Sequence, residues 1–204
     1  MGTDKIIRKA VFSTLAAIAV LFVFMVAMLV TFYPSTMMGL TYDLGMDSAS
    51  VHFARRAYKG SGDIYYIAYA TEVSIGMDDS DKIETCGEKF IADSEFEEYC
   101  AHKNEAISGE MSYEQYIYGK VCVAKYEQGK TQDAVDSAFE WNGGEFTRNN
   151  AAVAVLYTAM QSGDFETVAL IKTELQALQA TPLNSSELTY LQSVLSFIDQ
   201  YANN

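Results

Sequence analysis

The run from Ala10 to Tyr42 contains no charged residue, and its centre, Val11 to Tyr33, is almost wholly apolar. A helix rises about 1.5 Å per residue, so roughly 20 apolar residues cross the ~30 Å hydrocarbon core of a bilayer. The centre meets that length, and it lacks the polar stripe of a helix that packs on a protein core. The sequence therefore predicts a transmembrane helix over residues 10–34.

The residues before this segment indicate its orientation. Lys5, Arg8 and Lys9 precede it, and no basic residue follows before position 52. Lys and Arg concentrate on the cytoplasmic side of membrane helices. We therefore expect residues 1–9 to form a cytoplasmic tail and the chain after the membrane helix to be extracytoplasmic.

Two interpretations of the segment are possible, a retained anchor and a cleaved signal peptide. Its far end, Phe32-Tyr33-Pro34, helps to decide between them. Aromatic residues are typical of the membrane–water interface, and proline readily ends a helix. A signal peptide has a shorter apolar stretch of about 7–15 residues and a small-residue cleavage site, for which this end offers no clear match. We therefore expect a retained single-pass anchor in a cell membrane. A cleaved signal peptide is the alternative, and both place most of the chain outside the cytoplasm.

The formal net charge of −13 reflects 27 acidic and 14 basic residues, and three of the basic residues precede the membrane segment. The remainder is therefore more acidic than the whole chain. This argues against nucleic acid, whose binding depends on Lys and Arg that neutralise phosphates, and against tight docking on anionic lipid. An acidic surface favours solubility, and it also offers a face for cations or a basic partner.

Apolar residues recur at helical spacing after the membrane segment, and no segment alternates convincingly as a strand would. Residues 35–47 look like a short neck, and residues 48–204 are predicted to form an all-α domain. Its nine predicted helices cover residues 48–59, 63–75, 82–92, 95–107, 112–128, 131–141, 149–162, 164–180 and 187–201. The last of these opens with Asn184-Ser-Ser-Glu187, which has capping-box spacing.

Two of the predicted helix pairs are each joined by a short turn that contains glycine at the same place. Tyr126-Glu-Gln-Gly129-Lys130 and Met160-Gln-Ser-Gly163-Asp164 place Gly129 and Gly163 34 residues apart. This is the period of tetratricopeptide repeats, in which such a turn joins two antiparallel helices. Residues 113–180 resemble two degenerate tetratricopeptide units, and residues 48–107 are similar to one or two more. The resemblance implies an α-solenoid of antiparallel helix pairs, capped by the last helix; the alternative is a non-repeating helical bundle.

The histidine and acidic residues do not form a recognisable catalytic or metal-binding pattern. His52 and His102 stand 50 residues apart, whereas zinc ligands come at short spacings. An acidic turn lacks the alternating carboxylates and glycine of a calcium loop and favours a helix N-terminus; its members are Asp78, Asp79, Asp81 and Glu84. We therefore predict no catalytic residue, no metal and no cofactor.

The chain has three cysteines, Cys86, Cys100 and Cys122. A disulfide is permitted outside the cytoplasm, and an odd number leaves one thiol over. Cys86 and Cys100 lie on consecutive predicted helices, so these two are the candidate pair. The alternative is three small buried residues at helix contacts.

Tyrosine is abundant, with 14 residues in the chain. Tyrosines at helical spacing fill a core with their hydroxyl groups at its rim, or, on a concave face, they recognise a partner. The candidate partner-binding residues are Tyr65, Tyr66, Tyr69, Tyr116 and Tyr118.

These features together favour an interaction protein. We expect a membrane-anchored scaffold domain that acts outside the cytoplasm and binds a protein or peptide. The alternative is a structural accessory subunit that associates with a larger membrane complex through its transmembrane helix. An enzyme on a helical scaffold is the third hypothesis.

Overall fold

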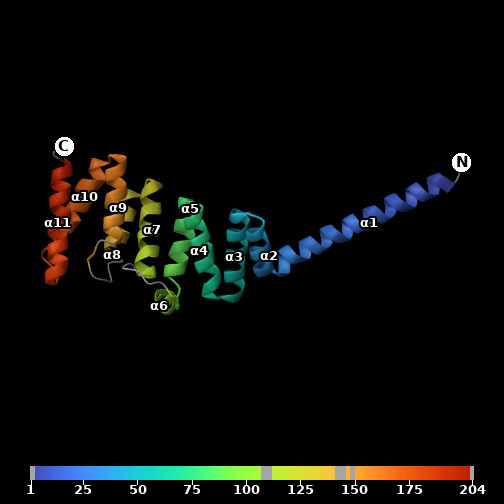
Figure 1. Cartoon of the computed structure of the whole chain (residues 1–204), viewed down its shortest axis with the longest axis horizontal. Helices are drawn as coiled ribbons and strands as arrows, with labels where there is room; N and C mark the ends of the chain where they lie inside the picture. Colours follow the sequence, from blue (N-terminus) through green and yellow to red (C-terminus); the bar gives the residue numbers. More distant parts are fainter. Residues whose placement is uncertain (1–2, 107–111, 141–145, 148–149, 203–204) are drawn as a thin grey trace. The chain divides into compact units, whose positions relative to one another are not determined.

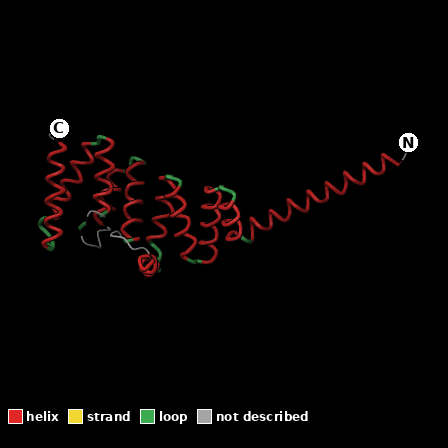
Figure 2. Tube along the Cα trace, viewed as in Figure 1, coloured by secondary structure: helices red, strands yellow, loops and turns green. Residues whose placement is uncertain are grey.

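The computed structural model describes residues 3–106, 112–140, 146–147 and 150–202, and the regular structure in this part of the chain is entirely helical (Figure 2). Its helices are α1 (Thr3–Phe32), α2 (Pro34–Asp43), α3 (Asp47–Ser61), α4 (Ile64–Gly76), α5 (Ser80–Ile91), α6 (Phe96–Ala106), α7 (Tyr113–Glu127), α8 (Thr131–Glu140), α9 (Ala151–Ser162), α10 (Phe165–Leu178) and α11 (Ser185–Ala202). The prediction of an all-α fold behind an N-terminal apolar helix is confirmed.

The chain divides into two compact units, Met1–Tyr66 and Ile67–Asn204, with the boundary inside α4. We call them the first unit and the second unit. The boundary differs from the predicted one at residue 48. The reason is that α3 packs extensively against α2 and so belongs to the same unit as α1 and α2.

The nine helices predicted after the membrane segment correspond to α3 through α11, and their ends agree within two residues wherever the structure describes them. The predicted ends at residues 107, 141 and 149 lie outside the described residues. The predicted capping box at the last helix is confirmed. The Asn184 N–H donates to Glu187 Oε2 (2.8 Å), and the Glu187 N–H donates to Asn184 Oδ1 (2.9 Å).

The predicted neck is wrong, because residues 34–43 form the helix α2. Tyr33 N–H still reaches back to the carbonyl oxygen of Leu29 (3.0 Å), which completes the hydrogen bonding of α1. Pro34 has no N–H to continue that series, and its fixed φ suits the first position of a new helix. One proline therefore ends α1 and begins α2.

The first unit joins α1 to an antiparallel pair, α2 and α3 (Figure 1). Apolar side chains line the inner faces of the pair, among them Met37, Met38, Val51 and Ala54. The hydroxyl of Ser50, which is fully buried, donates to the carbonyl oxygen of Met38 (2.9 Å).

The second unit is built around α7, which packs against α5 and α9 and which Figure 1 shows between them. Helix α8 packs against both α7 and α9, α10 packs against α9, and α11 packs against α10. The large side chains that are most deeply buried include Phe90, Ile117, Leu156, Ile171, Leu175, Leu191 and Ile198. Full burial of one such side chain contributes about 1.5–3 kcal/mol, so this unit has a substantial core of its own.

In four helix pairs, α2–α3, α4–α5, α7–α8 and α9–α10, the first helix ends in the same way. In each turn one residue has a left-handed φ, its N–H bonds to the carbonyl three residues back, and the next N–H bonds to the carbonyl five residues back. In the α7–α8 turn, for example, Gly129 N–H reaches Tyr126 (2.8 Å) and Lys130 N–H reaches Lys125 (3.0 Å). This is the Schellman arrangement, which supplies partners for the last carbonyls of a helix. The left-handed residues are Gly45, Asp78, Gly129 and Gly163, with φ of 68°, 55°, 77° and 72°.

Candidate functional site

The five candidate tyrosines are divided between the units. Tyr65 is 49% exposed and makes an edge contact with Tyr66, with 5.7 Å between ring centroids, and both belong to the first unit. The other three, Tyr69, Tyr116 and Tyr118, are half-buried and belong to the second unit. Tyr116 and Tyr118 are two residues apart on α7, so they face different sides of that helix.

Tyr116 and Tyr118 take part in an aromatic cluster of α5, α6 and α7. Tyr118 contacts the ring of Phe96 (5.6 Å between centroids), and Phe96 in turn contacts Phe90 (4.9 Å). Tyr116 packs against Tyr113 (6.5 Å). Burial, with a smaller contribution from the Glu114 carboxylate, raises the pKa of Tyr118 to about 12. These two tyrosines therefore contribute more to packing than to an open recognition face.

The polar edge of this cluster is formed by Glu72 of α4. Its Oε1 accepts hydrogen bonds from Tyr113 Oη (2.5 Å) and from Lys103 Nζ (3.0 Å). The Lys103 ammonium also lies over the rings of Tyr99 and Tyr113, at 5.7 and 5.5 Å from their centroids. A cation over an aromatic face is attracted by the ring quadrupole, so Lys103 ties α6 to α7 and to Glu72.

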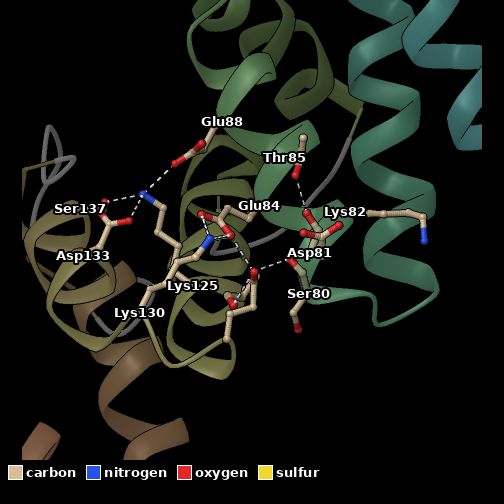
Figure 3. Close-up of polar contacts among 12 residues, drawn as sticks. Ser80, Asp81, Lys82, Glu84, Thr85, Glu88, Lys125, Lys130, Asp133 and Ser137 are labelled. Atoms are coloured by element: carbon tan, nitrogen blue, oxygen red, sulfur yellow. Dashed lines mark hydrogen bonds and ion pairs between the residues drawn. The ribbon is translucent and has the colours of Figure 1, made fainter.

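A second polar group surrounds Lys125, which is only 4% exposed (Figure 3). Its Nζ lies 2.8 Å from Glu88 Oε1 on α5 and 3.3 Å from Asp133 Oδ2 on α8, and it donates to Ser137 Oγ (2.9 Å). Burial by itself would lower the pKa of Lys125. The hydrogen bonds and charges of Glu88 and Asp133 outweigh burial and raise this pKa overall.

Glu84 on α5 is the buried acid of the same region. Both of its carboxylate oxygens accept hydrogen bonds from Lys130 Nζ (2.7 and 2.5 Å), and Gln128 Nε2 donates to Oε2 (2.7 Å). The two lysines therefore link α5 to both sides of the Gly129 turn (Figure 3). Every buried polar side-chain atom in the described residues has a hydrogen-bond partner, which is typical of a rigid scaffold.

A groove of about 430 Å³ opens beside this scaffold, at the beginnings of α8 and α10. Two carboxylates, three polar residues and one apolar side chain line it: Thr131, Gln132, Asp164, Glu166, Thr167 and Leu170. Gly129 and Gly163, the repeat-turn residues predicted from the sequence, stand two residues before Thr131 and one residue before Asp164. The two turns thus bring the groove residues together.

Asp164 of the groove is held by several hydrogen bonds. It is the N-cap of α10, where its Oδ1 accepts the Thr167 N–H (3.0 Å). Its Oδ2 accepts the hydroxyls of Thr167 (2.5 Å) and Tyr126 (3.1 Å). The Thr167 hydrogen bonds are the main reason why the pKa of Asp164 is lowered, so it is ionised at neutral pH.

The chemistry of this groove suits a cation. Asp164 supplies a fixed negative charge, Glu166 is exposed beside it, and Leu170 offers an apolar surface for the stem of a long side chain. A Lys or Arg side chain combines a charged head with an apolar stem. The groove was not foreseen from the sequence, although its two turns were, because only the packing of α8 with α10 creates it.

The candidate Cys86–Cys100 disulfide does not form in the structure, which has the alternative, three free and buried cysteines. All three cysteines are buried, with at most 1% exposure, and pack as small core residues. Burial raises the pKa of Cys100 and of Cys122 to about 12. Disulfide exchange requires a thiolate, so these protonated interior thiols are poor candidates for oxidation.

The remaining polar candidates belong to three different helices. His52 is exposed on α3, and His102 is exposed on α6, 3.9 Å from Glu98. Asp79 caps α5 by accepting the Lys82 N–H (3.1 Å), as expected for an acidic helix start. Among the residues whose side chains the structure describes, no group of three His, Cys, Asp or Glu could hold a metal ion.

Comparisons with known protein families, with curated proteins and with solved structures find no match to this chain.

Proposed function

We propose that the chain is a membrane-anchored interaction protein whose second unit binds a basic segment of a protein partner outside the cytoplasm. The observation that carries this proposal is the groove at the start of α8 and α10, where the ionised Asp164 stands beside the exposed Glu166 and the apolar Leu170. A lysine or arginine of the partner occupies the groove and pairs with these carboxylates.

The charge of the second unit supports a basic partner. This unit contains 23 acidic and eight basic residues, whereas the first unit contains four acidic and six basic residues. The net charges are therefore −15 and +2, which together give the −13 of the whole chain. A strongly acidic surface attracts a basic partner over long distances and speeds association.

The repeated turn supports an array of helix pairs as the scaffold for this groove. The same hydrogen bonds close the pairs α2–α3, α4–α5, α7–α8 and α9–α10. In a tetratricopeptide-like array, paired helices present extended surfaces to protein segments. We propose that the second unit works in this way.

The anchor is α1. By length and composition, one helix in the described residues, over the 22 residues Val11–Phe32, is long and apolar enough to cross a membrane. Lys5, Arg8 and Lys9 before it favour a cytoplasmic N-terminus. The described side chains from Val11 to Met25 are all exposed. This exposure also suits the second candidate function, that of an accessory subunit held by its membrane helix in a larger complex.

Site-specific photo-crosslinking in the full-length chain tests the proposed function. A photoreactive residue replaces Gln132 in the groove or, as the control, the exposed Gln192 on α11. We expect a protein adduct from position 132 only. Glu166→Arg should abolish it, whereas Glu174→Arg, at an exposed position of α10 outside the groove lining, should leave it intact.

An adduct of equal yield from both positions, or one that survives Glu166→Arg, would contradict binding in the groove. Exchanging α1 for an unrelated apolar helix separates the two candidate functions. The interaction protein keeps its adduct after this exchange, because the groove is unchanged, whereas the accessory subunit loses its association with the complex.

A further inference from the structure

The junction between α1 and α2 contains an arginine that substitutes for a missing backbone donor. Pro34 lacks the N–H that would bond to the carbonyl of Val30, four residues earlier. Arg56 of α3 donates to this carbonyl instead, with 3.0 Å from its Nη1 to Val30 O, and its Nη2 lies 3.4 Å from Thr31 O. A cation at the C-terminal end of a helix is also favoured by the helix dipole. The contact places the middle of α3 at the last turn of α1.

Arg56 belongs to a basic face of α3. His52, Arg55, Arg56 and Lys59 follow the i, i+3, i+4, i+7 spacing of one helix face. His52 and Lys59 are exposed, and the two arginines are half-buried. The opposite face of α3 is buried and contains Ser50, Val51, Phe53, Ala54 and Ala57.

The acidic residues nearest in sequence stand before and after the segment that forms the basic face. Asp43 ends α2, and Asp47 is the first residue of α3, so both stand at the α2–α3 turn. Asp63 follows the end of α3, where its Oδ1 accepts the Tyr65 N–H (2.9 Å).

The exposure of side chains at the end of α1 relates this basic face to the expected membrane surface. Val26, Leu29 and Val30 are half-buried against the rest of the first unit, whereas the described residues from Val11 to Met25 are exposed. Phe32 and Tyr33 are 64% and 57% exposed, as suits aromatic side chains at the headgroup level. Because Arg56 contacts the carbonyls of residues 30 and 31, its face of α3 lies at the same level, where lipid phosphates are found.

We propose that the basic face of α3, formed by His52, Arg55, Arg56 and Lys59, binds the phosphate groups of anionic lipids at the membrane surface from which α1 emerges. The acidity that argues against anionic lipid belongs to the second unit, since the first unit carries a net charge of +2. Basic residues next to a membrane helix are attracted to anionic lipid headgroups. The proposal rests on α1 as a membrane helix, which is also part of the proposed function.

Lipid selectivity of the full-length chain tests this proposal. The protein is reconstituted in vesicles of equal parts phosphatidylcholine and phosphatidylglycerol and extracted in mild detergent, and the lipids that stay bound are measured by native mass spectrometry. Arg55→Gln combined with Lys59→Gln removes two charges from the face and leaves Arg56 in place. The control, Lys89→Gln combined with Lys120→Gln, removes two charges from exposed positions of the second unit.

We expect the unmodified protein and the control to retain phosphatidylglycerol in preference, and the α3 variant to lose this preference by about tenfold. An α3 variant as selective as the unmodified protein would overturn the proposal, as would equal retention of both lipids by the unmodified protein. Vesicle flotation distinguishes a failure of lipid binding by α3 from a failure of α1 as a membrane helix. A protein that floats with vesicles but shows no selectivity refutes lipid binding alone, whereas one that does not float refutes the membrane helix as well.

Discussion

The two units of the molecule use their apolar residues in opposite ways. In the first unit, the longest apolar segment, α1, is exposed over most of its length. In the second unit, apolar side chains from α7 to α11 form a continuous core, with Leu156, Ile171 and Leu191 almost fully buried. Burial of apolar surface stabilises a fold, so the second unit is stabilised by its own packing, whereas the exposed apolar side chains of α1 fit the proposal that lipid surrounds this helix.

Polar groups repeat this contrast. The first unit uses Arg56 to supply a hydrogen bond to backbone that a proline has left without one. The second unit uses Lys125 and Lys130 to join three helices through side-chain carboxylates. The polar contacts of the first unit thus organise the junction between α1, α2 and α3, and those of the second unit join α5, α7 and α8 beside the groove.

The largest expected effect is on the apolar helix. Val20→Arg combined with Val23→Arg places two charges at positions that are 68% and 66% exposed. Each arginine near the centre of a membrane helix costs about 2.5–3.5 kcal/mol on the insertion scale, so stable membrane association should be lost. Carbonate extraction of membranes measures whether the protein stays associated with the membrane. The control, Gln176→Arg with Gln192→Arg in the second unit, should stay in the membrane pellet, and equal extraction of both variants would contradict the contrast.

The next effect concerns the buried lysine. Lys125→Met removes the ammonium that Glu88, Asp133 and Ser137 share. Both carboxylates are about half exposed and regain water, so we expect a loss of about 2 kcal/mol, below the 3–5 kcal/mol typical of a fully buried pair. Urea unfolding followed by circular dichroism measures it. An unchanged midpoint would show that these ion pairs do not stabilise the scaffold.

The sign of the pKa shift adds a pH dependence to the same variant. The pKa of Lys125 is raised in the folded protein, so its contribution is complete below the lysine pKa of the unfolded chain. It is lost as the pH rises through the folded value. The difference in stability between the unmodified protein and Lys125→Met should therefore be constant from pH 6 to about 9 and shrink only in more alkaline solution.

A pair of glycines tests how closely the helices of the second unit pack. A Cβ atom on Gly87 would lie 2.2 Å from Val121 Cγ2, whereas one on Gly119 would lie 3.7 Å from Ala154 Cβ, an ordinary contact. Gly87→Ala should therefore cost about 1–3 kcal/mol through overpacking between α5 and α7. Gly119→Ala should be neutral or stabilise by up to about 1 kcal/mol. Equal midpoints in thermal unfolding of the two variants would contradict this packing.

The smallest expected effect is a gain in stability at the α4–α5 turn. Asp78 has a φ of 55° and takes the place that glycine has in the other three turns. Asp78→Gly should stabilise the second unit by about 1 kcal/mol, because glycine adopts this conformation without a steric cost. Thermal unfolding gives the value, with Gly129→Ala as the matched control that should lose a similar amount. A lower midpoint for Asp78→Gly would show that the aspartate side chain contributes more than its backbone costs.

The local features of the fold could be predicted from the sequence. The periodicity of apolar residues predicted the helices, and the spacing of Asn184 and Glu187 predicted the capping box of α11. Gly129 and Gly163 marked two turns because glycine is the usual residue at a left-handed helix end. The turn at Asp78 was predicted as an acidic helix N-terminus, which Asp79 forms, but the left-handed conformation of Asp78 was not foreseen, since aspartate is less usual than glycine at such a position. Helix α2 was missed and predicted as a neck, because Pro34 indicates the end of one helix as readily as the start of another.

The long-range contacts could not be read from the sequence. Arg56 is 26 residues from Val30, and Lys130 is 46 residues from Glu84, with no local pattern that pairs them. Lys125 looks like an ordinary surface lysine until α5 and α8 cover it. The groove likewise depends on the packing of α8 with α10, although its acidic character was expected from the composition.

The central claim is that α1 crosses a membrane and separates a short basic tail from the acidic second unit. The most direct test is cysteine labelling of intact cells that express Lys9→Cys or Gln192→Cys, with a maleimide that cannot cross membranes. The native cysteines give little background because they are buried. We predict that position 192 is labelled in intact cells and that position 9 is labelled only after the membrane is permeabilised. Labelling of both positions from the same side, or loss of position 9 from the mature protein, would contradict the claim.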